Sequence, residues 1–220
     1  MRVDIKQTNV YTFDELSDEA KAKARDWLRE GYLDYDWWDS VYEAAETAGA
    51  LLGITLHRER KNSPTIYFSG FCNQGDGARF EGSYSYRPGW RKALLSEFPL
   101  SCEDSLHGVV EIPGRRDLLD IGERLQEAQA RHFYRLEATC TATGRGEHSG
   151  CMAVEVVDGY SLYRDIGDAE DDVRDALRLF ADWIYDCLER EHDYLLSDES
   201  MDESIRSNEY EFTEAGEIYS

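Results

Sequence analysis

The sequence lacks the features that mark several large protein classes. No stretch approaches the roughly 20 apolar residues that a membrane-spanning helix needs, and the first ten residues, MRVDIKQTNV, contain no long apolar run of the kind found in secretory signals. The five cysteines include no CxxC pair, so the sequence indicates neither a disulfide framework nor an ordinary zinc ribbon. We therefore expect a cytoplasmic protein with reduced cysteines, no membrane contact and no cofactor.

Basic residues are also scarce. The chain has 24 basic and 46 acidic residues, a net charge of -22. Residues 1–110 account for -5 of this charge and residues 111–220 for -17, of which -15 falls in the segment 165–220. Each contact with a phosphate requires a cation from the protein, so direct binding to nucleic acid or to an anionic membrane is disfavoured. A basic partner is favoured instead.

The length and composition are those of a globular protein. With 220 residues, 41% of them hydrophobic, the chain can bury a substantial core and fits one large domain better than two small ones. We predict a single α+β domain over residues 1–220, with a highly acidic segment 165–220. Its core is expected to be an antiparallel sheet of about four to six strands packed against several helices.

Periodicity places the elements of this fold. Helical spacing predicts helices at about 18–31, 34–52, 90–97, 116–131, 168–192 and 199–207. Alternation of apolar and polar residues predicts strands near 3–11, 54–60, 65–72, 79–87, 134–140 and 152–156, with a final extended piece at 209–212. The two glycines of the run 73–77 suit a hairpin loop between two of these strands.

The predicted helix at 168–192 has one apolar side and one acidic side. At 100° per residue its carboxylates gather on the side opposite Val173, Leu177 and Phe180. We take this row as the candidate partner-binding site: Asp168, Asp172, Asp175, Asp182, Asp186, Glu189 and Asp193. An acidic face that serves only solubility is the alternative interpretation. The other interpretation is that the row mimics nucleic acid or docks onto a basic protein surface.

Two other groups are secondary candidates. The glycine-rich run that contains Gln74 and Asp76 resembles a phosphate cradle, but it has no Walker lysine and lies between strands, which favours a turn. Tyr84, Tyr86 and Trp90 follow it and could stack on a ligand, although tyrosines on a strand face more often serve packing.

Signals for catalysis are weak. The sequence contains no GxSxG, HExxH or EF-hand pattern. Cys140, His148 and Cys151 could be brought together by a hairpin as a zinc site or a thiol and imidazole couple, but their spacing matches no common site. Buried cysteines and a loop histidine are the competing interpretation. No metal site is predicted.

Four segments carry a resemblance to a known family. The longest is YFSGFCNQGDGARFEGSY at residues 67–84, with an SGFxxQGDGAxFxGSY hairpin motif, and it is accompanied by TFDELSDEAKAKA at 12–24, HSGC at 148–151 and NEYEFTEAG at 208–216. The chain thus resembles, over nearly its whole length, a widespread group of phage and prophage proteins whose members are sometimes labelled antitoxin-like. The resemblance implies a viral or prophage origin and supplies no catalytic residues.

Charge layout and resemblance together lead to one functional expectation. We expect a phage-type anti-defence inhibitor, of the anti-CRISPR or anti-restriction kind, that binds a basic host protein and acts as a nucleic-acid mimic. The first alternative is an antitoxin-like or regulatory module that neutralises a basic partner without competing with nucleic acid. The second is an enzyme that uses Asp76, His148 or Cys151.

Overall fold

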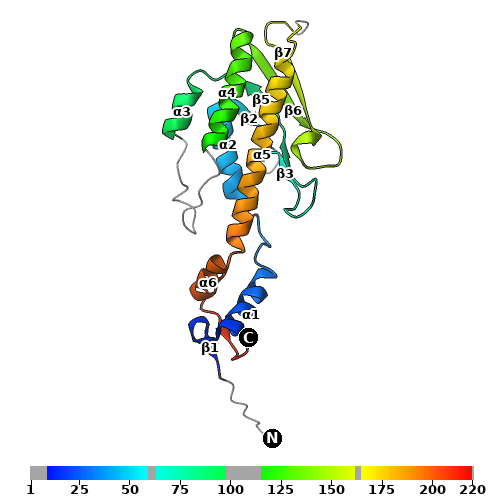
Figure 1. Ribbon diagram of the computed structural model, residues 1–220. Coiled ribbons are helices and arrows are strands. Elements are labelled where there is room, and N and C mark those ends of the chain that lie inside the picture. Colours follow the sequence, from blue (N-terminus) through cyan, green and yellow to red (C-terminus); the bar gives the residue numbers. More distant parts are fainter. Residues whose placement is uncertain (1–8, 59–62, 98–114, 162–164, 220) are drawn as a thin grey trace. The chain divides into compact units, whose positions relative to one another are not determined.

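The chain divides into two compact units. The computed structural model describes residues 9–58, 63–97, 115–161 and 165–219 (Figure 1). Trp38–Arg190 form the larger unit, which we call the sheet unit. Met1–Trp37 and Glu191–Ser220 form the smaller one, which we call the terminal unit. The expectation of a single domain stays a prediction.

A four-stranded antiparallel sheet forms the centre of the sheet unit, with the strand order β2-β5-β6-β7. Its strands are β2 (Ile54–Leu56), β5 (Gly82–Ser85), β6 (Leu136–Ala142) and β7 (Met152–Asp158). Along β6, Leu136, Ala138 and Cys140 are at most 3% exposed, whereas Glu137 and Thr139 are exposed. Since successive side chains of a strand point to opposite faces, one face of the sheet is core and the other is polar.

Helices cover the buried face of this sheet. They are α2 (Asp39–Leu52), α4 (Arg115–Arg131) and α5 (Ala169–Leu195), the last belonging to the sheet unit as far as Arg190, while α3 (Trp90–Glu97) packs against α2 and α4. Figure 1 shows α4 and α5 side by side in front of the strands. The Phe180 ring of α5 packs edge-on against the Phe80 ring at 5.6 Å. The apolar stripe of α5 is therefore anchored in the core.

A second, two-stranded sheet joins this core. β3 (Ile66–Phe68) pairs antiparallel with β4 (Ala78–Phe80), as the predicted hairpin requires. A 3-10 turn, η2 (Ser149–Cys151), precedes β7. Arg79 Nη1 donates a hydrogen bond to Thr143 O at 2.9 Å, which ties β4 to the loop between β6 and β7.

The terminal unit combines the two ends of the chain. Its elements are β1 (Tyr11–Thr12), η1 (Phe13–Glu15), α1 (Asp18–Arg29), α6 (Asp198–Ser207), β8 (Glu211–Phe212) and the last turn of α5. β1 pairs antiparallel with β8. Phe13, Ala24 and Phe212 are among the side chains of one small buried cluster.

Arginines neutralise much of the acidic charge on α6. Arg25 Nε lies 2.5 Å from Asp202 Oδ1, and Arg29 Nη2 lies 2.5 Å from Asp198 Oδ1. Arg206 also pairs with Asp14 at 3.0 Å. The hydrogen bond from Arg29, together with the charge of Arg25, lowers the pKa of Asp198. Arginines therefore neutralise part of the negative charge of the segment 165–220.

The α+β class, the antiparallel sheet and the long acidic C-terminal helix are confirmed. The predicted helix at 34–52 begins only at Asp39. The predicted strand at 79–87 is interrupted at Glu81, because β4 pairs with β3 and β5 pairs with β2. Glu81 joins the two sheets, since its N–H donates to Thr65 O at 3.0 Å and its O accepts the N–H of His57 at 2.8 Å.

Some predictions fall outside the described residues, namely most of the strand at 3–11, the end of the strand at 54–60, and the reduced state expected of one of the five cysteines, Cys102. Within the described ranges, no helix combines the length and the apolar character that crossing a membrane would take.

Candidate functional site

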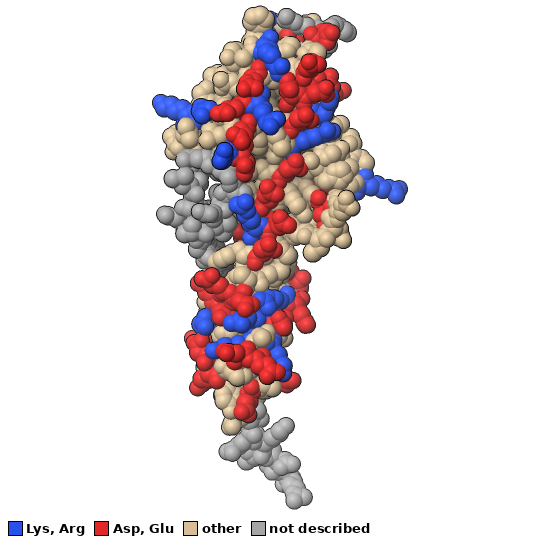
Figure 2. All heavy atoms as spheres, in the orientation of Figure 1, with Lys and Arg blue, Asp and Glu red and all other residues tan. Residues whose placement is uncertain are grey.

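The outer side of α5 carries the carboxylates that the sequence singled out. Leu177 and Ile184 are fully buried, whereas Asp175, Asp182 and Asp186 are exposed. At 3.6 residues per turn these three aspartates lie on one side of the helix. Figure 2 shows acidic side chains following the helix, with basic side chains interspersed among them.

Neutralisation is concentrated at the beginning of α5. Asp172, a member of the predicted row, forms an ion pair with Arg131 at the end of α4. Arg174 pairs with Glu170 and Asp171, which lie outside the row. The row is therefore partly compensated over its first turn and a half.

Four carboxylates farther along the helix have no such partner. We call Asp175, Asp182, Asp186 and Glu189 the acidic face. Within the described residues, none of the four has a lysine or arginine nitrogen within 4.0 Å. Arg178, which could have reached them, instead lies with Nη2 3.4 Å from Met152 O. The acidic face is thus available to an external cation.

The carboxylates of the acidic face repel one another. Partial burial raises the pKa of Asp186, and the charges of Glu189, Asp182 and Asp117 raise it further, while Arg190 acts in the opposite direction. Asp117 belongs to α4, so the negative field extends from one helix to the next. When the neighbours of a carboxylate disfavour its charge, an approaching cation stabilises that charge.

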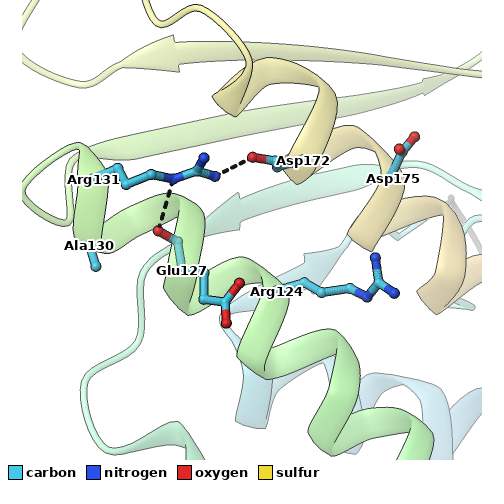
Figure 3. A pocket seen from close by; sticks show the side chains of 6 residues that line it. All are labelled: Arg124, Glu127, Ala130, Arg131, Asp172 and Asp175. Atoms are coloured by element: carbon cyan, nitrogen blue, oxygen red, sulfur yellow. Dashed lines mark hydrogen bonds and ion pairs between the residues drawn. The ribbon is translucent and has the colours of Figure 1, made fainter.

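A hollow of about 490 Å³ lies between α4 and α5. It is lined by Arg124, Glu127, Ala130, Arg131, Asp172 and Asp175. Figure 3 shows Arg131 spanning one end toward Asp172, and Arg124 extending from α4 toward α5. Arg131 Nε also donates to Glu127 O at 3.3 Å. Because the rim carries charges of both signs, the hollow suits a polar side chain of a partner better than an apolar ligand.

The two ends of the predicted row are separate from the acidic face. Asp168 precedes the first residue of α5 and is exposed, and its backbone O accepts the N–H of Asp172 at 3.1 Å. Asp193 belongs to the terminal unit, where its Oδ1 lies 3.5 Å from His192 Nδ1.

The carboxylate of Asp76 organises the loop between β3 and β4. Its Oδ2 accepts the N–H of Asn73 at 2.7 Å and that of Cys72 at 3.1 Å. The bond from Asn73 is the main reason that the pKa of Asp76 is lowered. Gln74, the other secondary candidate in this loop, is exposed. The loop is therefore a turn held by an internal acceptor.

This loop borders the acidic face. Tyr185 of α5 donates its hydroxyl to Gly70 O at 2.8 Å, and its ring lies 5.4 Å from the Phe71 ring. Partial burial is the main cause that raises the pKa of Tyr185, and the charge of Asp76 raises it further. The primary candidates and the loop candidates thus lie on neighbouring parts of the sheet unit.

The aromatic candidates are mostly core residues. Tyr84 is 2% and Trp90 4% exposed, so neither ring is open to a ligand. Burial raises the pKa of Tyr84 to about 12, and its hydroxyl accepts a hydrogen bond from Gln129 Nε2 at 3.3 Å. Tyr86 is half-buried, with its ring 4.5 Å from that of Tyr134. The packing interpretation therefore describes Tyr84 and Trp90.

The proposed thiol and imidazole couple forms in part. Cys151 Sγ lies 3.3 Å from His148 Nε2, and Gly150 N–H donates to His148 Nδ1 at 3.1 Å. Cys140 is fully buried, and burial raises its pKa to about 12. Among the described residues, no three His, Cys, Asp or Glu side chains are arranged to hold a metal ion. The structure thus brings two of the three residues together.

One family model matches the chain, over residues 37–198, and its description is Domain of unknown function (DUF8835). This match spans 162 of the 220 residues. The chain belongs to the DUF8835 family. None of the curated proteins and none of the solved structures matches the chain.

The DUF8835 match follows the division of the chain. Residues 37–198 contain the whole sheet unit, Trp38–Arg190, and extend one residue before it and eight residues after it. The acidic face and the loop with Asp76 both lie inside the match. The pairing of β1 with β8 lies outside it. The candidate site therefore belongs to the part of this chain that defines the DUF8835 family.

Sequence reasoning missed the contribution of α4 to this site. The predicted helix at 116–131 was correct, but nothing in its sequence indicated that Asp117 and Arg131 act on carboxylates of α5. The one available signal was that both helices are amphipathic and so must share a core. Their relative rotation, which decides the ion pairs, depends on packing.

Proposed function

We propose that the protein is a phage-type anti-defence inhibitor, of the anti-CRISPR or anti-restriction kind, that binds a basic host protein through the acidic face of α5. The observation that carries the proposal is a set of four carboxylates on one anchored helix, none with a described cation within 4.0 Å. The phage and prophage resemblance supports the biological setting. The net charge of -22 favours a basic partner over nucleic acid.

The spacing of the acidic face suits a surface that normally holds a nucleic-acid strand. A rise of 1.5 Å per residue places Asp175 and Asp182 about 10.5 Å apart along the axis, and Asp182 and Asp186 about 6 Å apart. Cationic grooves that follow a phosphate backbone present charges that a row of this kind can meet. The carboxylates lie farther apart than the phosphates of a duplex backbone. The row therefore imitates the charge of a nucleic acid and not the positions of its atoms.

The acidic face contributes mainly to the rate and salt dependence of association. An exposed ion pair contributes at most about 1 kcal/mol, so four pairs alone do not make a tight complex. Opposite fields nevertheless steer the encounter and are screened over about 8 Å at physiological ionic strength. Binding should therefore weaken markedly as salt is raised.

The test compares two triple-lysine variants with the same change in charge. One carries Asp175→Lys, Asp182→Lys and Asp186→Lys. The control carries lysine at Glu30, Glu43 and Glu155, which are exposed and do not belong to α5. Proteins retained from host lysate at low salt are identified, and affinity for each purified protein is then measured. We expect the first variant to lose the basic partner and the control to keep it.

Competition separates the inhibitor from the antitoxin-like alternative. Labelled DNA or RNA is bound to the purified partner, and the protein is titrated in. Displacement of the nucleic acid supports the mimic. Formation of a ternary complex contradicts it and favours a regulatory module that neutralises the partner elsewhere. Equal loss of binding in both lysine variants would show that net charge, rather than the acidic face, is recognised.

The contact between Cys151 and His148 suggests a second candidate, an enzyme with a thiol nucleophile, but the other hydrogen bond of His148 argues against it. Because His148 Nδ1 accepts the N–H of Gly150, Nε2 carries the proton of the neutral ring and donates toward Cys151 Sγ. In this tautomer His148 is not arranged to remove the thiol proton. Cys151→Ser distinguishes the two candidates, because it silences such an enzyme and leaves an inhibitor active.

A further inference from the structure

Three aromatic side chains are exposed where α4 meets β6 and where β7 ends. Phe133 is 66%, Tyr134 47% and Tyr160 82% exposed. The guanidinium carbon of Arg135 lies 4.5 Å from the Tyr160 ring centroid and 5.6 Å from that of Phe133. We call Phe133, Tyr134, Arg135 and Tyr160 the aromatic surface. Tyrosine and arginine are enriched among residues that dominate protein interfaces.

The backbone of this surface is strained. Phe133 and Tyr134 have φ angles of 55° and 60°, in the left-handed region. Tyr134 N–H donates to Gln129 O at 2.8 Å, which places Phe133 at the position after a helix end that glycine usually occupies. For a bulky aromatic residue this conformation is an outlier, and such outliers gather at functional sites.

A buried glutamine holds the strained turn in place. Gln129 is fully buried, and its Nε2 donates to Leu136 O at 2.7 Å while its Oε1 accepts the N–H of Leu136 at 3.0 Å. The side chain thus pairs with the first residue of β6 as a neighbouring strand would. The Tyr86 ring supports Tyr134 at 4.5 Å. The aromatic surface is therefore preorganised, which lowers the entropy lost on binding.

Arg135 provides the charge of this surface. Within the described residues it has no carboxylate oxygen within 4.0 Å, although the chain contains 46 acidic residues. Its guanidinium is positioned by two rings instead. A stacked guanidinium keeps its N–H donors free at the edge, and those donors match a carboxylate in bidentate geometry.

We propose that the aromatic surface is a docking site for a protein segment in which a carboxylate lies between apolar side chains. The carboxylate pairs with Arg135, and the apolar side chains cover Phe133 and Tyr160. A nucleic-acid strand, which could also stack on the rings, fits poorly, because a single guanidinium does not offset the repulsion of phosphates by a chain of charge -22.

This surface takes an acidic segment, whereas the acidic face of α5 takes a basic one. The two proposals therefore fail independently. A variant with lysine at Asp175, Asp182 and Asp186 should lose the basic partner and still bind through the aromatic surface. A variant at Arg135 should do the reverse.

The experiment selects a random peptide library displayed on phage against the full-length protein. The most enriched peptide is synthesised with a fluorophore, and its affinity is measured by anisotropy. The variants are Arg135→Gln and Tyr160→Ser, and Arg145→Gln is the control because Arg145 is also exposed and lies in the loop between β6 and β7. Circular dichroism confirms that each variant is folded.

We expect enriched peptides to contain Asp or Glu beside Leu, Phe or Trp. Arg135→Gln and Tyr160→Ser should each weaken binding at least about tenfold, the loss typical of an interface hot spot. The control should bind like the parent protein. Enriched peptides without a carboxylate, or binding unaffected by Arg135→Gln, would overturn the proposal. So would tight binding of an oligothymidine strand that Arg135→Gln abolishes.

Discussion

At the scale of single residues, the backbone of Phe133 offers a direct test of strain. A left-handed conformation costs an L-residue about 1–2 kcal/mol, and a glycine substitution removes this strain. Glycine also loses more conformational entropy on folding, which destabilises the folded state by about 0.5–1 kcal/mol. Phe133 has φ 55° and a 66% exposed side chain. Phe133→Gly should therefore raise the free energy of unfolding by about 0.5–1 kcal/mol.

Phe133→Ala is the matched control for this prediction. It removes the same ring but keeps the Cβ that causes the strain, so it should bring no gain in stability. Urea unfolding of both variants measures the difference. A glycine variant no more stable than the alanine variant would mean that the turn is not strained at this position.

The lowered pKa of Asp76 predicts how the stability of its loop depends on pH. A carboxyl with a depressed pKa in the folded state stabilises the fold above its unfolded pKa and loses that contribution as the pH falls through its folded pKa. Asp76→Asn should therefore destabilise the protein at neutral pH, and the difference should shrink below the ordinary range of aspartate. Unfolding free energies of both proteins at neutral and strongly acidic pH measure this.

At the scale of elements, the packing of α3 against α4 depends on a glycine. A Cβ at Gly122 would lie 2.2 Å from Cζ3 of Trp90, whose indole N–H donates to Gln126 Oε1 at 2.7 Å. Overpacking destabilises a fold by about 1–3 kcal/mol. The higher helix propensity of alanine offsets about 1 kcal/mol of this destabilisation. Gly122→Ala should thus lower the free energy of unfolding by up to about 2 kcal/mol.

Chemical denaturation with tryptophan fluorescence checks this prediction. Gly31→Ala serves as the comparison, because no atom lies within 4 Å of a Cβ built at Gly31. Its effect should stay within about 0.5 kcal/mol. A Gly122→Ala variant that is more stable than the parent by about 1 kcal/mol, the full gain in helix propensity, would show that the Trp90 ring moves aside without cost.

Elements with strong periodicity were predictable from the sequence, and junctions were not. The apolar stripe of α5 and the N-cap of α1, where Ser17 Oγ accepts Ala20 N–H at 3.3 Å, follow from local patterns. The change of strand partner at Glu81 does not, because alternation continues through it. Gly82 is required there, since a Cβ would lie 2.4 Å from Thr55 O.

The candidate site was predictable to the same extent. Periodicity placed Asp175, Asp182 and Asp186 on one side of a helix, as the structure has them. It could not show that Asp172 pairs with Arg131, or that Arg178 turns to a backbone carbonyl. Ion pairs between elements depend on which faces meet, and that information is spread over the whole core.

At the scale of the whole molecule, the net charge predicts a response to salt. Self-repulsion of a chain of charge -22 destabilises the compact state, and added ions screen it. The melting temperature at neutral pH should therefore rise with moderate concentrations of sodium chloride. The rise should be smaller near the sequence pI of about 4.5, where repulsion is weak. Differential scanning calorimetry at both pH values measures it, and equal rises would contradict the electrostatic explanation.

The two units of the structure divide the negative charge differently from the sequence, which predicted one acidic segment at 165–220. The terminal unit holds 7 basic and 19 acidic residues, and the sheet unit holds 17 and 27. The smaller unit therefore has the higher charge density, although Asp198 and Asp202 of its α6 each pair with an arginine. Linear charge along the chain consequently does not locate the most available carboxylates.

The strand pair β1 and β8 has a practical consequence for handling the protein. Tyr11 lies opposite Phe212, so the segment near the start of the chain and the segment near its end complete the same small core. Trimming either one would leave the other without its neighbour, and both would be lost together. Fluorophores attached beside the two segments should accordingly report one shared event of local opening, with identical kinetics.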